Sequence, residues 1–135
     1  MSNSIIKLFQ IDAFTSEIFK GNPACVMPLE NWLSDDLLLK IAKENNVSET
    51  AFFIKKDDHF YLRWFTPEIE MDLCGHATLA TAYCLKEHLN YSFDNSYLSN
   101  LLHIQVSEKW QHYQNISMAD HLHYFLKLGN LFESP

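Results

Sequence analysis

The chain has 135 residues, the usual size of one domain. Ten lysines and arginines against seventeen aspartates and glutamates give a net charge of −7, and the single arginine is Arg63. Phosphate binding needs clustered cations, so nucleic acid is not an expected partner. Hydrophobic residues make up 47% of the chain, enough for a folded core, and no apolar run is as long as a membrane span requires, so a membrane partner is not expected either.

Cysteine usage and the first residues bear on the compartment. Three cysteines are too few and too scattered for a disulfide framework or a zinc site, namely Cys25, Cys74 and Cys84. The opening residues 1–4 carry no signal-like pattern. We therefore expect a cytoplasmic globular domain.

The first elements in chain order are two strands and a helix. Alternating apolar residues predict a strand over 5–14, a turn at Gly21-Asn22-Pro23, and a second strand over 24–29. Ser34 is a good N-cap for a helix with an apolar stripe, and Asp35 and Asp36 suit its positive end. Asn45-Asn46 favours a left-handed ending of this helix.

A hairpin and a second helix follow. The ranges 50–54 and 60–65 read as paired strands around a polar tip. A helix is predicted after Cys74-Gly75, from His76 through Leu85, and its residues are apolar or small all round until Lys86. Such a helix is normally buried on every side, so we expect strands around it. After about residue 90 the pattern weakens, with alternation at 102–106 and no assignment for 119–135.

The start of the second predicted helix is the sharpest chemical feature. The first N–H groups of a helix lack internal partners, so Gly75 and the following residues could bind a carboxylate or phosphate, and His76 could shuttle a proton. A thiol at this position, Cys74, could serve as a base or nucleophile if the helix end lowers its pKa. The plainer interpretations are a tight turn at Gly75, a core histidine and a small buried cysteine.

Glu49 is the second candidate. It lies at the mouth of an apolar strand, where partial loss of water would suit general acid/base chemistry. Composition alone favours the other interpretation, a solvated loop glutamate. His121 and His123 are interpreted as surface residues, because two histidines with no third ligand do not make a metal site. Metal ligands are therefore not expected anywhere in the chain.

Five blocks of sequence resemble one family. In order they are Phe9-Gln10-Ile11-Asp12-Ala13-Phe14-Thr15 with Phe19-Lys20-Gly21-Asn22-Pro23-Ala24, then 41–52, Leu62-Arg63-Trp64-Phe65-Thr66-Pro67, and Asp72-Leu73-Cys74-Gly75-His76-Ala77-Thr78-Leu79-Ala80. Over about residues 5–90 the chain resembles the phenazine-biosynthesis PhzF-like isomerase family. The tail, about 91–135, diverges from the family pattern.

The resemblance implies an α+β class and a diaminopimelate-epimerase-like fold. In each lobe of that fold a mixed, mostly antiparallel sheet wraps around a buried central helix, and the active site lies between two lobes. It implies that Glu49 is the acid/base residue and that Ser48, Gly75, His76 and Ala77 bind substrate. Epimerase relatives place a proton-shuttling cysteine where this chain has Cys74.

The chain is much shorter than the family's members, so residues 1–135 are expected to form one N-terminal lobe. A truncated or frameshifted gene, or a second lobe on a separate chain, would explain this length. The expected function is cofactor-free proton transfer on a small carboxylate-bearing metabolite, without activity if the second lobe is required. Two alternatives stay open: a cysteine-based amino-acid racemase or epimerase using Cys74, and a non-catalytic binding lobe. The expected partner is a second copy of the chain or a separately encoded second lobe.

Overall fold

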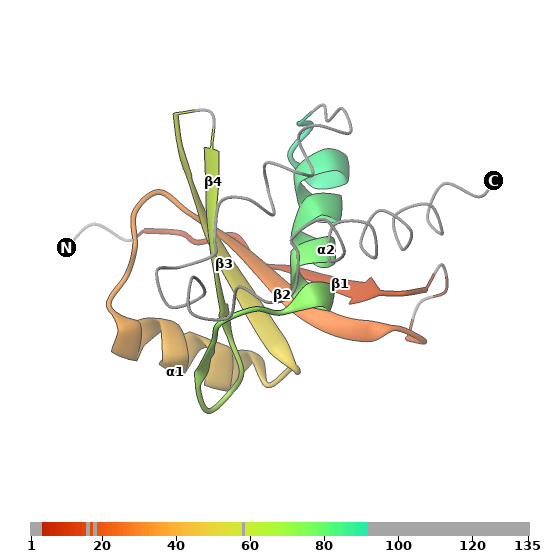
Figure 1. The fold of residues 1–135 in the computed structure, drawn as a ribbon, viewed down its shortest axis with the longest axis horizontal. Helices are drawn as coiled ribbons and strands as arrows, with labels where there is room; N and C mark the ends of the chain where they lie inside the picture. The colour runs from red at the N-terminus through yellow and green to blue at the C-terminus, as the bar shows by residue number, and fades with distance from the viewer. Residues whose placement is uncertain (1–3, 16, 18, 58, 92–135) are drawn as a thin grey trace, which may run out of the picture.

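A computed structural model describes residues 4–15, 17, 19–57 and 59–91. Five strands form one sheet in the order β1-β2-β3-β4-β5 (Figure 1). Strands β2 and β3 run parallel, and the other neighbours are antiparallel. The bounds are β1 Phe9–Ala13, β2 Asn22–Leu29, β3 Glu49–Lys56, β4 His59–Phe65 and β5 Glu70–Met71.

The first strand is shorter than its apolar pattern predicts. Pairing with β2 begins at Phe9 opposite Val26, and Ile5 is 92% exposed, so the alternation upstream has no neighbouring strand to pair with. Strand β2 in turn begins two residues earlier than predicted, because Asn22 and Pro23 pair with the end of β1. The predicted hairpin is confirmed. Strands β3 and β4 pair from Thr50 opposite Phe65 to Lys56 opposite His59, next to the turn.

Helix α1, Asp35–Asn45, covers one face of the sheet. Its buried Leu38 and Ala42 pack against Met27, Phe52 and Phe65. The predicted ends are confirmed: the Ser34 side chain accepts a hydrogen bond from the Leu37 N–H, and Asn46 is left-handed at φ 50°. Because α1 connects two neighbouring parallel strands, it has to cross the sheet on one face.

Helix α2, Gly75–Tyr83, covers the opposite face (Figure 1). Its alanines, Ala77 and Ala80, are buried in one cluster with Ala24, Val26 and Ala51, and small residues on both sides allow close approach. Thr78 and Thr81 are buried as well, and Tyr83, at the end of the helix, is the one residue of α2 that is exposed, at 47%. The expected burial of this helix is therefore confirmed for its residues up to Ala82, each of which is buried or half-buried.

After Tyr83 the helix widens into a π-helical turn, η1, over Cys84–His88. The Leu89 N–H donates to the Cys84 carbonyl at 3.1 Å, five residues back, so the regular spacing ends here. The turn has no counterpart in the apolar pattern, which predicted one continuous helix to about Leu85.

The α+β class with a mixed, mostly antiparallel sheet is confirmed. The alternation at 102–106, the unassigned 119–135, and His121 and His123 lie outside the described residues. Among the helices that the structure describes, none combines the length and apolar character needed to cross a bilayer.

Candidate active site

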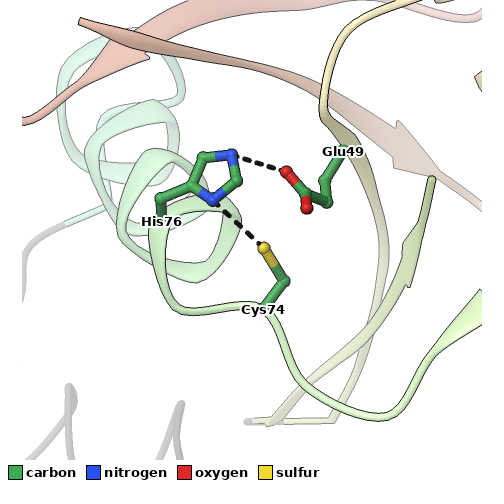
Figure 2. Close-up of side chains that lie close together, drawn as sticks. All are labelled: Glu49, Cys74 and His76. Carbon is green, nitrogen blue, oxygen red and sulfur yellow. Dashed lines mark hydrogen bonds and ion pairs between the residues drawn. The ribbon is translucent and has the colours of Figure 1, made fainter.

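Three predicted site residues meet between the start of β3 and the start of α2. Glu49 is the first residue of β3, Cys74 is the N-cap of α2, and His76 lies in its first turn. Figure 2 shows the His76 imidazole between the other two side chains. Its Nε2 lies 2.8 Å from Glu49 Oε2, and its Nδ1 lies 3.3 Å from Cys74 Sγ.

Strand alternation explains why Glu49 faces α2. Successive side chains of a strand point to opposite faces of the sheet. Ala51 and Phe53 belong to the cluster under α2, whereas Thr50 points the other way and accepts a hydrogen bond from the Asn45 amide at 3.1 Å. Glu49 shares its parity with Ala51, so its carboxylate lies on the face that carries α2.

The carboxylate and the imidazole are largely shielded from water. The side chain of Glu49 is 17% exposed and that of His76 is 10% exposed. Although Nε2 and Oε2 are close, their geometry is not that of a directed hydrogen bond, and neither atom has another partner among the described residues. Buried polar atoms without a directed partner are uncommon and are found at functional sites. This pair therefore has hydrogen-bonding capacity left for a ligand.

The thiol of Cys74 behaves differently from the expectation. Burial raises its pKa to about 11, and the nearby negative charge of Glu49 adds to the rise. The backbone N–H groups of Ala77 and His76 oppose the rise but do not outweigh it. The predicted lowering of this pKa by the helix end is wrong, because loss of water around a 7% exposed residue is the larger effect. At neutral pH Cys74 is a protonated thiol.

The N-terminus of α2 is left open by its own sequence. Its N-cap makes no side-chain hydrogen bond to the helix, and its first turn contains no acidic residue. The positive end of the helix dipole thus points toward the Glu49–His76 pair without an internal counter-charge. Gly75 is half-buried, and its φ is not positive, so a left-handed turn is not the reason for this glycine.

Ser48 and Ala77 lie at the margins of this arrangement. The exposed Ser48 hydroxyl donates to Asn22 Oδ1 at 3.1 Å, which ties the start of β3 to the start of β2. Ala77 is fully buried and can offer only its backbone. The Ser48–Asn22 bond went unnoticed in the sequence, where Asn22 was interpreted only as a turn residue.

The other cysteines take no part in the site. Cys25 and Cys84 are buried free thiols, and burial raises the pKa of both. By contrast, Cys74 joins Glu49 and His76 in a group whose ligand atoms all lie within 4.8 Å of one another. Counting cysteines alone missed this group. The Cys-x-His spacing at a helix start could have revealed the pair of Cys74 and His76, but not Glu49, which comes from β3.

Comparison with known proteins agrees with this geometry. The sequence model described as "Phenazine biosynthesis-like protein" matches residues 11–115. An uncharacterized isomerase of Pseudomonas aeruginosa is 56% identical over 85 residues, which are 63% of this chain and 33% of that protein. The crystal structure of a PhzF-family phenazine biosynthesis protein from Enterococcus faecalis superposes with a TM-score of 0.62 at 53% identity, covering 64% of this chain and 33% of that one.

A second structure gives the same result. A putative phenazine biosynthesis PhzC/PhzF protein from Clostridium difficile superposes with a TM-score of 0.64 at 44% identity, over 67% of this chain and 35% of that one. The fold is the α+β fold of PhzF-family proteins, of which the chain covers a part. The chain belongs to the phenazine biosynthesis-like (PhzF) protein family, and it spans about a third of the length of the relatives it matches.

Proposed function

We propose that the chain contributes one half of an acid/base isomerase site, in which Glu49 takes a proton from a carbon atom of a small carboxylate substrate and returns it elsewhere. The observation that carries the proposal is the buried pair of Glu49 Oε2 and His76 Nε2, 2.8 Å apart and without a directed partner. A carboxylate next to an imidazole can accept a proton and pass it on, and no cofactor is needed for that chemistry. Membership of a family that includes isomerases supports the same assignment.

Substrate binding would fall to the start of α2. The N–H groups of Gly75 to Ala77 have no side-chain cap beyond the weak contact of the Cys74 sulfur with His76 and Ala77. They suit a carboxylate, which gains about 0.3–1 kcal/mol from the helix dipole in addition to its hydrogen bonds. His76 would donate from Nε2 to the same ligand, and Ser48 would hold the start of β3 through Asn22. In this arrangement the negative charge of the substrate lies opposite the base.

The length of the match limits the expected rate. The chain spans about a third of its relatives, and groups from a second lobe would normally stabilise the carbanion-like charge. Loss of one such preorganised donor costs about 10²–10³ in rate. We therefore expect weak binding and slow turnover, or none, from this chain by itself.

A partner that completes the cleft is part of the proposal, either a second copy of the chain or a separately encoded second lobe. Large exposed hydrophobic side chains support it, since Phe19 is 95% exposed and Tyr83 is 47% exposed. We place the assembly in the cytoplasm. A dimer is expected by light scattering at tens of micromolar. A monomer at that concentration would exclude a second copy as the partner, and a separately encoded second lobe would remain.

Hydrogen–deuterium exchange at carbon tests the chemistry. Amino acids and aromatic carboxylates with an acidic C–H bond are incubated with the full chain in D₂O, and exchange is followed by NMR over hours. Exchange that is lost in Glu49→Gln but kept in Cys74→Ser supports the proposal. Glu44→Gln is the matched control, because Glu44 is an exposed glutamate of α1, and it should have no effect.

The opposite patterns identify the alternatives. Exchange that survives Glu49→Gln and is lost in Cys74→Ser would assign the base to the cysteine, as in a racemase. Carboxylate binding with no exchange in any variant, even after a second lobe is supplied, would identify a non-catalytic binding lobe. Either result overturns the role of Glu49.

A further inference from the structure

Glu49, Cys74 and His76 together offer the three side-chain types that bind zinc in proteins: a carboxylate, a thiolate and an imidazole. One ligand atom of each lies within 4.8 Å of the others. Two of these residues also carry buried polar atoms without a directed hydrogen bond, Glu49 Oε2 and His76 Nε2. The spacing of the three ligand atoms and the two unpaired buried atoms are features of the chain itself, and neither depends on the identity of a substrate.

We propose that these three side chains bind a zinc ion, with water in the fourth position, and that the bound ion blocks the acid/base chemistry of Glu49. Zinc with ligands at about 2.0–2.3 Å places tetrahedral ligand atoms roughly 3.3–3.8 Å apart. Cys74 Sγ and His76 Nδ1 are already 3.3 Å apart. The carboxylate approaches the same imidazole from the other side, so binding requires a turn of the ring that brings one nitrogen toward both Sγ and the carboxylate.

The ligands come from two elements that are fixed by the fold. Glu49 is held by its strand pairing opposite Ala24, and Cys74 and His76 are held by the first turn of α2. The change needed for binding is therefore confined to side-chain rotations. Within the described residues no further histidine, cysteine, aspartate or glutamate joins the group, and a zinc site with three protein ligands keeps an open position for water.

Zinc binding displaces one proton and transfers no electron. The S–H bond of Cys74 breaks, the sulfur–zinc bond forms, and the proton passes to solvent. The ion competes with this proton, so binding weakens as the pH falls. A dissociation constant of about micromolar is expected. An ion held in this way is reversible, which suits inhibition better than a permanent structural role.

Cobalt(II) absorption tests the site directly. Metal-free full-length chain is titrated with Co²⁺, which takes zinc's place in tetrahedral sites and gives a thiolate-to-metal charge-transfer band. One equivalent of the band is expected, and Zn²⁺ should abolish it. The Cys74→Ser variant should lose the band, and His76→Ala should weaken binding at least tenfold. Cys84→Ser and Cys25→Ser are matched controls at buried thiols away from the site, and both should keep it.

Three results would overturn the site. They are absence of binding in a calorimetric titration with about 100 µM Zn²⁺, well above the expected zinc constant, survival of the cobalt band in Cys74→Ser, and its loss in Cys84→Ser or Cys25→Ser while circular dichroism shows a folded chain. Cobalt binds such ligands more weakly than zinc, so the cobalt titration extends to about 1 mM Co²⁺. The inhibitory effect rests on the proposed function and has its own readout. If zinc binds but leaves Glu49-dependent deuterium exchange unchanged, inhibition is wrong and the metal site stands. If zinc does not bind, the exchange experiment is unaffected.

Discussion

The two helices lie on opposite faces of one sheet, and their first turns are built in opposite ways. At the start of α1, Ser34 caps the Leu37 N–H, and Asp35 and Asp36 complement the helix dipole in contact with water. At the start of α2, Cys74 provides no side-chain cap, the first turn has no acidic residue, and the residues around it are mostly buried. The acidic side chain beside α2, Glu49, comes from a different element.

The difference separates a helix start that serves stability from one that leaves room for a ligand. The first turn of α1 is neutralised by its own residues, so it holds little attraction for an outside anion. The first turn of α2 depends on whatever lies opposite it. Figure 2 shows that this is Glu49, beside the His76 side chain of the turn itself, and the hydrogen-bonding capacity of Glu49 and His76 is incomplete. An incomplete helix start is thus the better guide to the site in this fold.

The largest expected effect concerns how α1 is attached. Leu38 is fully buried and packs against the sheet, so Leu38→Ala should lower the free energy of unfolding by about 2–5 kcal/mol through lost burial and a cavity. Urea unfolding followed by circular dichroism measures it. Leu37→Ala is the matched control, since Leu37 is 43% exposed on the same helix and should cost much less. Equal losses at both positions would mean that α1 is not anchored through its sheet-facing side.

The next effect concerns the reactivity of the Cys74 thiol. A pKa of about 11 lies well above that of a free thiol, so the thiolate fraction at pH 8 should be lower by roughly two orders of magnitude. Alkylation by iodoacetamide, resolved by peptide mass spectrometry, should be slower than that of glutathione by at least this factor. The rate should rise about tenfold per pH unit up to pH 10, because only the thiolate reacts.

Fast alkylation of Cys74 at neutral pH would contradict the conclusion that burial dominates the pKa of this thiol. It would mean that proton transfer to His76 Nδ1, 3.3 Å away, outweighs burial and creates a thiolate–imidazolium pair. Cys84 is the internal control, since burial raises its pKa to about 11 as well and it contacts no histidine nitrogen among the described interactions.

The smallest effect concerns the cap of α1. Ser34→Ala should lower the free energy of unfolding by about 1 kcal/mol, because the Leu37 N–H loses its acceptor. Ser34→Asn keeps an acceptor and should be close to neutral in the same urea experiment. A loss in Ser34→Asn as large as in Ser34→Ala would show that the cap contributes through packing and not through its hydrogen bond.

Local signals in the sequence were enough for most elements. Ser34 and the asparagines after α1 marked that helix correctly at both ends, because capping depends on residues that are neighbours in the chain. The true start of β1 and the π-helical turn at Cys84 could not be predicted in this way. The first depends on which residues of β2 are available for pairing, and the second on packing around α2.

The candidate site also combines features that the sequence predicts with features that depend on how the chain folds. Glu49, Gly75 and His76 stood out from the sequence as separate candidates, and family resemblance assigned them roles. That Cys74, His76 and Glu49 touch could not be predicted from spacing, since it requires the parallel pairing of β2 with β3. The rise in the pKa of the Cys74 thiol could not be predicted from the sequence either, because it is caused by burial, which is a property of the folded chain.

The side-chain parity of β3 makes the site sensitive to the length of the short connection that precedes it. Glu49 faces α2 and Thr50 faces α1 because the strand pairs with β2 starting at Ala24 opposite Glu49. Inserting or deleting one residue between Asn46 and Ser48, if absorbed by sliding β3 along β2, would exchange the two faces and turn the carboxylate away from His76. A change of two residues would preserve the faces. The sheet should therefore tolerate a change of even number better than one of odd number. A two-residue slide would still carry Glu49 about 7 Å along β2, away from His76, so the site itself requires the present length.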